Sequence, residues 1–361
     1  MPTEQVRQFT VTDEDDGIRL DRWFKRNLPE AGFGTVARWA RTGQLRIDGK
    51  RAAPGDRIEA GQVIRVPPLE EEKAAARPAP KREPLTEDEI EFVRSLVVEA
   101  DPAAIIVNKP PGLATQGGTK TNDHLDRLLD GLVDEGQPRP KLVHRLDKDT
   151  SGALLIARTP RAAAFFSKAF SGRTARKVYW ALVVGVPSVE DGLIDLPIAK
   201  QPGTGGEKVH VDEESGQAAR TRYRVIERAG NRAAWVELQP HTGRTHQLRV
   251  HMAAIGHPIV GDGKYAGQEA FLTGAISRKL HLHARRLRID QPDGGRIDVT
   301  AEPPEHFRES LAMLGFDPAA GDLPLDEVQP PTREAVKAKA RAHAKQVRKE
   351  RRGERRNRRR G

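Results

Sequence analysis

The most informative segment of the chain is His144-Arg145-Leu146-Asp147-Lys148-Asp149-Thr150-Ser151-Gly152. It places an imidazole, a guanidinium, two carboxylates and two hydroxyls within nine residues. Such groups are costly to bury unless they pair with one another or with a ligand. The apolar run at 153–157 is typical of a buried strand, which would hold the polar loop rigidly at its end. Catalytic loops are commonly held in this way; a helix cap or a solvated turn is the simpler alternative for the segment alone.

Length and composition narrow the class of protein. The 361 residues suggest two or three domains. The chain contains no cysteine, which excludes disulfides and thiolate chemistry and suits a reducing compartment. No apolar run approaches the roughly 18 residues that a membrane helix needs, and the acidic residues at 13–16 argue against a signal or transit peptide. We therefore expect a cytoplasmic protein that does not enter a membrane.

Positive charge is concentrated near the C-terminus. The whole chain has a formal net charge of +10, and residues 333–361 alone hold 14 Lys or Arg against three Glu. The rest of the chain is therefore close to neutral. A like-charged block of this kind is expected to be disordered by itself and to serve as an arm that binds polyanions. A tail that only keeps the protein soluble is the alternative.

The first 66 residues have a pattern of their own. Apolar residues at 20, 23, 24 and 28 repeat at helical spacing, with arginines and lysines between them. A second predicted helix carries Arg38 and Arg41 and stops at Gly43, and a predicted strand then ends in the turn Asp48-Gly49. This arrangement resembles an S4-type RNA-binding domain, in which Arg38 and Arg41 would contact RNA. A small helical cap with ordinary surface arginines is the alternative.

The remaining chain is divided by its composition. Residues 67–88 are rich in Pro, Ala, Glu and Lys and are expected to form an extended linker. A second domain is expected over 89–316, followed by a Pro-rich segment and the basic tail at 317–361. Strands that cluster with helices between them predict an α+β fold with a mixed, mainly antiparallel sheet. The predicted strands are 105–108, 152–157, 177–184, 220–226, 233–238 and 281–289, and the predicted helices are 122–132, 160–171 and 244–256.

Four segments, in order, resemble the motifs of the RluA-type RNA pseudouridine synthases, which convert uridine in RNA to its C-glycoside isomer. The first is Lys109-Pro110-Pro111-Gly112, and the second is the segment 144–152 described above. The third is Lys177-Val178-Tyr179-Trp180-Ala181-Leu182-Val183, which resembles the aromatic strand of the family. The fourth spans 243–252 and continues to Asp262. The chain departs from the family pattern only locally, at Ala266, where relatives often have Gly after the Tyr.

This resemblance implies a reaction and its main residues. The domain would hold a central RNA-binding cleft, and the isomerisation would need no cofactor and no metal. The catalytic carboxylate of the family corresponds to Asp147, which could attack C6 of the base, attack C1′ of the ribose, or remove the 2′ proton. Arg249 would keep this carboxylate ionised, because a nearby guanidinium lowers the pKa of an Asp. Tyr179 would stack on the target base, and its hydroxyl could transfer a proton.

The resemblance also implies contacts with RNA. Arg145 would fill the gap that is left when the target nucleotide flips out of the RNA. Four more residues would contact phosphates or brace the cleft: Lys109, Lys177, Arg244 and His246. The N-terminal module makes the chain most similar to the RluC-like branch, which implies large-subunit (23S) ribosomal RNA or a pre-ribosomal particle. Transfer RNA or another RNA is the alternative substrate, and no obligate protein partner is indicated.

Two other classes of function compete with this one. The histidines at 241, 246, 251, 281 and 283 could suggest a metal hydrolase. His246 and His251 would, however, lie about 140° apart around a helix, whereas metal-binding pairs on a helix are three or four residues apart. A non-catalytic RNA-binding or ribosome-assembly protein would leave Asp147, Tyr179 and Arg249 without a role. We therefore favour the enzyme.

Overall fold

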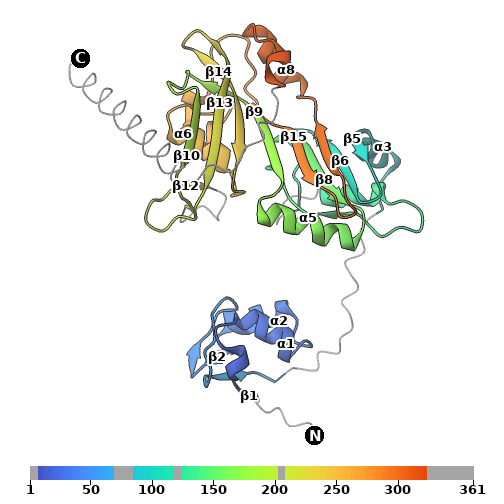
Figure 1. The fold of residues 1–361 in the computed structure, drawn as a ribbon, viewed down its shortest axis with the longest axis vertical. Helices are drawn as coiled ribbons and strands as arrows, with labels where there is room; N and C mark the ends of the chain where they lie inside the picture. Colours follow the sequence, from blue (N-terminus) through green and yellow to red (C-terminus); the bar gives the residue numbers. More distant parts are fainter. Residues whose placement is uncertain (1–6, 69–83, 118–122, 202–207, 323–361) are drawn as a thin grey trace, which may run out of the picture. The chain divides into compact units, whose positions relative to one another are not determined.

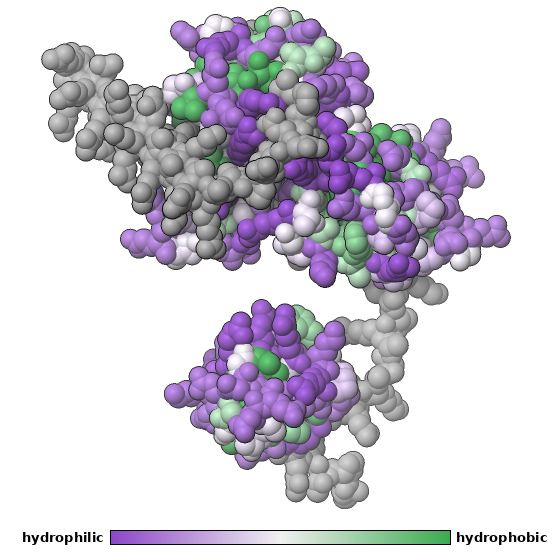
Figure 2. Space-filling view, viewed as in Figure 1, coloured by the Kyte–Doolittle hydropathy of each residue, from purple (hydrophilic) through white to green (hydrophobic). Residues whose placement is uncertain are grey.

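The computed structural model describes residues 7–68, 84–117, 123–201 and 208–322 (Figure 1). The chain divides into two compact units, Met1–Pro84 and Leu85–Gly361, and each is described by itself. On the face drawn in Figure 2, hydrophilic residues cover most of each unit, and apolar residues form separate patches. No helix among the described residues has both the length and the apolar character needed to cross a membrane.

The smaller unit combines a four-stranded sheet with two helices. Its strands are β1 (Arg7–Thr10), β2 (Arg46–Ile47), β3 (Lys50–Arg51) and β4 (Val63–Val66), in the order β1-β4-β2-β3. Helices α1 (Leu20–Asn27) and α2 (Phe33–Thr42) contribute Trp23, Phe24 and Trp39 to one buried core with the sheet. Helix α2 ends at Gly43, whose φ of 73° suits glycine. The predicted helices and the Asp48-Gly49 turn are confirmed.

The larger unit is built on a sheet of ten strands. These are β5 (Val97–Ala100), β6 (Ala104–Lys109), β7 (Lys141–Leu142), β8 (Ser151–Ala157), β9 (Arg176–Val184), β10 (Asp191–Asp195), β13 (Arg220–Ala229), β14 (Ala233–Pro240), β15 (Leu282–Asp290) and β16 (Arg296–Thr300). Eight of them follow the order β10-β13-β14-β9-β15-β8-β6-β5, while β16 pairs with β15 and β7 with β8. Among the described pairings of this sheet only β15–β8 is parallel. The predicted mixed, mainly antiparallel sheet is therefore confirmed.

Helices cover both faces of this sheet. At one end, α5 (Pro160–Gly172) packs on one face of β6, β8 and β15, and α3 (Glu87–Ser95), α4 (Leu125–Leu128) and the 3-10 helix η2 (Leu129–Leu132) cover the other. At the other end, α6 (Gln247–Ala254) packs on β9, β13 and β14, opposite α8 (Glu305–Met313). Because β8 lies between covered faces, all seven of its residues are buried.

Besides the 3-10 helices η1 (Asp13–Asp15), η3 (Gly267–Ala270) and η4 (Pro318–Gly321), three short elements complete the described chain. Strands β11 (Ile198–Lys200) and β12 (Val209–Val211) form a separate antiparallel pair. Helix α7 (Gly263–Ala266) follows α6 and carries Tyr265. Hydrogen bonding between Val209 and Tyr265 joins the small pair of strands to α7.

The structure corrects both predicted limits of the second domain. Helix α3 starts behind a capping box made by Thr86 and Glu89, so the folded unit begins inside the predicted linker at 67–88. At the other end, Gly321 packs against two tryptophan rings and Asp322 pairs with Arg285, so the unit extends beyond 316. Most of the predicted linker and the whole basic tail at 333–361 lie outside the described residues.

Candidate active site

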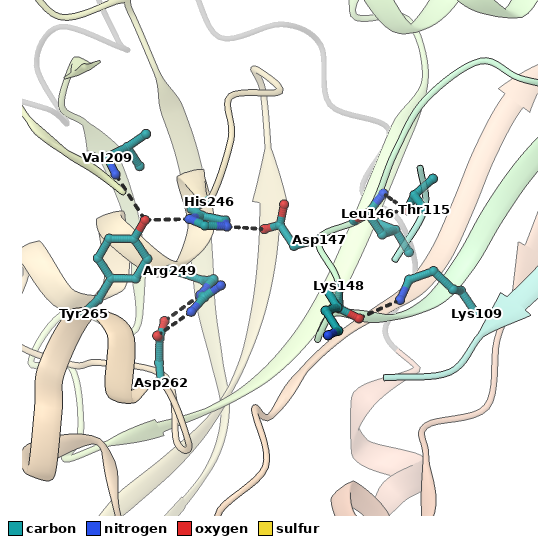
Figure 3. Close-up of polar contacts among 10 residues, drawn as sticks. All are labelled: Lys109, Thr115, Leu146, Asp147, Lys148, Val209, His246, Arg249, Asp262 and Tyr265. Atoms are coloured by element: carbon teal, nitrogen blue, oxygen red, sulfur yellow. Dashed lines mark hydrogen bonds and ion pairs between the residues drawn. The ribbon is translucent and has the colours of Figure 1, made fainter. Parts of the chain in front are cut away.

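Residues 144–150 of the polar segment form part of the loop between β7 and β8, and Leu146 anchors this loop. The backbone N–H of Leu146 donates to Thr115 Oγ1 at 3.2 Å, and the Thr115 hydroxyl donates to the Leu146 carbonyl oxygen at 2.6 Å. Both residues are buried. One threonine thereby satisfies both backbone groups of Leu146 and fixes the residue that precedes Asp147 (Figure 3).

Lys109 braces the same loop from the end of β6. Its side chain is 0% exposed, and Nζ donates to the carbonyl oxygens of Pro110, Leu113 and Lys148 at 2.9, 2.7 and 3.0 Å. Burial lowers the pKa of Lys109 to about 7, an effect that nearby carboxylates partly oppose. All three ammonium donors are used inside the protein. Of the two roles predicted for Lys109, contact with phosphate or bracing of the cleft, its geometry supports bracing.

His144 is also a structural part of the loop. Its Nε2 accepts a hydrogen bond from the backbone N–H of Leu155 at 2.9 Å, and its ring stacks on Phe170 with 4.0 Å between centroids. Burial, followed by the positive charge of Lys177, lowers the pKa of His144 to about 3. The imidazole is therefore neutral, and it ties the loop to the buried strand β8.

A cleft of about 370 Å³ opens beside this loop. The three predicted catalytic residues line it from three different elements: Asp147 from the loop, Tyr179 from β9 and Arg249 from α6. Four of the predicted RNA-contacting residues also line it, namely Arg145, Lys177, Arg244 and His246. Residues as far apart in the sequence as Arg145 and Arg249 thus meet in one cavity.

Tyr179 has a protonated hydroxyl at neutral pH. Its strand β9 lies between β14 and β15, so the residue is supported from both sides. Burial, and next the negative charge of Asp147, raise the pKa of Tyr179 above its usual value. Lys177 lies two residues earlier on the same strand and also lines the cleft, and burial lowers its pKa.

The guanidinium of Arg249 is hydrogen-bonded to Asp262, a residue to which the sequence assigned no role. Its Nε and Nη2 donate to the two carboxylate oxygens of Asp262 at 2.8 and 2.7 Å, and both side chains are buried. Burial alone would lower the pKa of Arg249, but the hydrogen bonds and charge of Asp262, with a smaller contribution from Asp147, raise it. Arg249 therefore adds positive charge near Asp147, as expected of a nearby guanidinium, while it is paired with Asp262.

The side chain of His246 brings a basic group close to Asp147. Its Nε2 lies 3.9 Å from Asp147 Oδ2, and its Nδ1 lies 2.6 Å from the hydroxyl of Tyr265 (Figure 3). The ring of Tyr265 also contacts the Arg249 guanidinium, which lies 5.1 Å from the ring centroid. Sequence reasoning did not assign roles to Asp262 and Tyr265. The sequence pointed to them only by their position: Asp262 ends the extended fourth motif, and Tyr265 follows three residues later.

The other predicted site residues lie elsewhere. Arg38 and Arg41 belong to α2 of the smaller unit, where Arg41 is exposed and Arg38 is half-buried. Both arginines therefore belong to a different unit from the cleft.

Helix α6, predicted from residue 244, begins at Gln247 because His246 has a left-handed backbone with φ of 52°.

Three of the five histidines that could suggest a metal site form hydrogen bonds with other groups. His251 contacts Thr221 Oγ1 and the Leu196 carbonyl, each at 2.9 Å. His281 and His283 likewise use both ring nitrogens in contacts with hydroxyl and carbonyl oxygens. Within the described part of the chain, no three His, Cys, Asp or Glu residues form a cluster that could hold a metal ion.

Comparisons with known proteins identify the same class of enzyme that the residues of the cleft indicate, the RNA pseudouridine synthases. A profile described as RNA pseudouridylate synthase matches residues 103–254. The chain is 32% identical to ribosomal large subunit pseudouridine synthase C of Vibrio cholerae, over 85% of this chain and 96% of that protein. It is 36% identical to RNA pseudouridine synthase 4, mitochondrial, of Arabidopsis thaliana, over 75% of this chain and 70% of that protein. Among solved structures, human RNA pseudouridylate synthase domain containing 4 matches with a TM-score of 0.54 and 29% identity, over 64% of this chain and 98% of that one.

The chain belongs to the RNA pseudouridylate synthase family, as an RluA-type member. It is therefore an enzyme that isomerises uridine in RNA. The non-catalytic alternative is not supported.

Proposed function

We propose that this enzyme modifies uridine in large-subunit (23S) ribosomal RNA. The relative from Vibrio cholerae is named for the ribosomal large subunit, and its similarity extends over 96% of its own length. A protein that is similar over its whole length is more informative about the substrate than one that shares only the catalytic domain. Transfer RNA or another RNA is the alternative substrate.

The catalytic carboxylate in this proposal is Asp147. This assignment rests on how the backbone around Asp147 is held. Buried Thr115 and buried Lys109 fix the backbone on either side of Asp147, and its side chain lines the cleft. Preorganised support of this kind is what a catalytic group requires. Arg249 and other basic residues of the cleft place positive charge near this carboxylate.

The reaction is balanced without an external reagent. The N1–C1′ bond breaks, the C5–C1′ bond forms, C5 loses its proton and N1 gains one. Asp147 would act on C6, on C1′ or on the 2′ proton, and Tyr179 would stack on the base with its hydroxyl protonated. Arg145, which is exposed beside the cleft, would fill the gap left by the flipped nucleotide.

The remaining basic residues would supply affinity. In the proposed complex, Lys177 and Arg244 contact phosphates beside the cleft. The smaller unit acts as an S4-like RNA-binding domain through Arg38 and Arg41, and the net charge of residues 333–361 adds contacts with the phosphate backbone. No cofactor enters this scheme.

We place the enzyme in the cytoplasm with its ribosomal substrate. A chain without cysteine suits that reducing compartment. The relative from Arabidopsis thaliana is named as mitochondrial, so location in an organelle is the alternative. Fractionation of cells that express the tagged full-length chain separates the two.

The experiment that tests the substrate is a map of pseudouridines, at single-nucleotide resolution, in RNA from cells with and without the gene. We expect loss of one or more pseudouridines from 23S ribosomal RNA, and their return when the wild-type gene is restored. Loss from transfer RNA with unchanged ribosomal RNA would contradict the proposed substrate.

A further inference from the structure

We propose that His246 is a positioning residue for the catalytic carboxylate and that Tyr265 fixes the tautomer of His246 required for this role. The inference rests on the proposed function of Asp147. It concerns a chain of contacts from Val209 through Tyr265 and His246 to Asp147 (Figure 3).

The tautomer follows from the hydrogen bonds of Tyr265. Its hydroxyl oxygen accepts a hydrogen bond from the backbone N–H of Val209 at 3.3 Å. The hydroxyl proton then has an acceptor in His246 Nδ1, which lies 2.6 Å away. A ring nitrogen that accepts a proton in this way carries none itself, so the proton of the neutral imidazole is on Nε2. Nε2 is the nitrogen that faces Asp147.

The neutral state follows from the surroundings of His246. The charged and titratable groups that face it come from the catalytic loop, from α6, and from the segment that contains α7: Asp147, Arg249, Asp262, Lys264 and Tyr265. Burial is the largest effect and lowers the pKa of His246; the two carboxylates oppose it, and the two cations add to it. A neutral Nε2–H can orient the carboxylate of Asp147 without protonating it. A cationic imidazole would instead hold the carboxylate in an ion pair.

The backbone holds the ring in this place. His246 has φ of 52° and ψ of 18°, a left-handed conformation that residues other than glycine seldom adopt. The turn before it is fixed by the Gln247 side chain, whose Oε1 accepts from the Thr242 hydroxyl at 2.6 Å and from the Arg244 N–H at 3.1 Å. Backbone strain that is imposed by such a network is common at functional sites.

The distance to Asp147 suits a group that acts during catalysis. At 3.9 Å, the Nε2–Oδ2 separation is longer than the roughly 3.2 Å upper range of an N–H···O hydrogen bond. Catalytic hydrogen bonds are often long in the free enzyme and shorten in the complex with substrate. The proposed contact therefore forms fully when RNA occupies the cleft.

The test compares three substitutions in the full-length enzyme. His246→Gln places an amide N–H near the position of Nε2, whereas His246→Asn places one near Nδ1 and cannot reach Asp147. Asparagine also tolerates a left-handed backbone well, so strain does not explain a loss in that variant. Tyr265→Phe keeps the ring against Arg249 and removes only the hydroxyl that fixes the tautomer.

Each variant is assayed by release of tritium from C5 of uridine in one RNA substrate, together with RNA affinity. We expect His246→Asn to lower kcat about 10- to 100-fold, the effect of losing a hydrogen bond to a charged group, with unchanged KM and RNA affinity. His246→Gln should recover most of that loss. Tyr265→Phe should lower kcat by a smaller factor, again without a change in KM.

Three outcomes would overturn the inference. A raised KM with unchanged kcat in His246→Asn would show that His246 only contacts RNA. Equal losses in His246→Asn and His246→Gln would show that the Nε2 position is not what matters. Wild-type kcat in Tyr265→Phe would show that the tyrosine does not set the tautomer.

Failure of the proposed function gives a different pattern. If the wild-type enzyme releases no tritium, the proposed substrate is wrong. If Asp147→Asn matches the wild type, the assignment of Asp147 is wrong. If those two behave as expected while the His246 and Tyr265 variants match the wild type, only the present inference fails.

Discussion

Tyr179 has two properties that substitution can separate: a flat ring and a protonated hydroxyl. Tyr179→Phe keeps the ring, and stacking of a base on an aromatic side chain contributes about 1–3 kcal/mol. We expect this variant to bind substrate RNA normally and to react slowly. Tyr179→Leu loses both properties and should be impaired in both respects. RNA affinity and single-turnover rates measure the two effects.

The difference in rate and RNA affinity between Tyr179→Phe and Tyr179→Leu distinguishes a role in the cleft from a role in the core. A tyrosine that served only to fill the core would give small and similar losses of activity in both variants, with most of the damage in stability. Unfolding of each variant in urea supplies this control. Equal and mild effects on rate and affinity would contradict a role for Tyr179 in the cleft.

At the level of residues, the sequence predicted which side chains line the cleft better than it predicted their partners. Asp147, Tyr179 and Arg249 lie in motifs whose order along the chain was visible. The pairing of Arg249 with Asp262 depends on how the chain returns after α6, a path that no local pattern shows. The burial of Lys109 was missed because a lysine after an apolar strand normally marks the surface.

At the scale of secondary-structure elements, the parallel pair β8–β15 has a close backbone approach that an added methyl group would disturb. Gly152 has φ of 114° and faces Ala284, and a Cβ built on it would lie 2.3 Å from the Ala284 carbonyl oxygen. Gly152→Ala must therefore shift one backbone against the other. We expect it to lower the free energy of unfolding by more than about 2 kcal/mol, as measured by urea denaturation.

Gly172 provides the matched control. It is the last residue of α5, and a Cβ built on it meets no atom within 4 Å. Gly172→Ala should leave stability unchanged or raise it by at most about 1 kcal/mol. If the two glycine variants unfolded at the same urea concentration, the close approach of β8 and β15 would not be a determinant of stability.

The elements themselves were predictable where one pattern dominated. Strand β8 is apolar from Ala153 to Ala157 because helices cover both faces, and its limits agree closely with the predicted 152–157. Helix α3 and the 3-10 helix after Phe316 were missed. The first is short and carries an exposed acidic face, and the second is held by packing against Trp180 and Trp235 from distant strands. Only the folded sheet brings those rings to it.

The whole molecule should lose stability in mild acid because it buries neutral histidines. Burial lowers the pKa values of His251, His281 and His283 to about 4 each. In the unfolded chain the same groups titrate near pH 6.5, at about their unperturbed pKa. Their stabilising contribution is therefore complete above about pH 6.5, falls as the unfolded chain takes up protons, and is lost by about pH 4. Each histidine contributes a slope of up to about 1.4 kcal/mol per pH unit.

Urea unfolding between pH 7.5 and 5 tests this dependence. That range lies above the usual pKa of carboxylates, so the buried histidines and the buried Lys109 dominate the change. All of them bind more protons in the unfolded chain, so we expect the free energy of unfolding to decrease throughout the range as the pH falls. A constant value down to pH 5 would mean that these histidines are not buried as neutral groups.

The most direct test of the central claim compares wild-type enzyme with Asp147→Asn, both full length, on 23S ribosomal RNA. The measurement is tritium released from C5 of uridine, with RNA affinity and unfolding recorded for both proteins. The substitution keeps the shape of the side chain but removes the carboxylate that would act as nucleophile or base. We predict that the wild type converts its target uridine, whereas Asp147→Asn binds the RNA equally well and releases no tritium. Turnover by Asp147→Asn at even a few per cent of the wild-type rate would contradict the assignment of Asp147 as the catalytic carboxylate.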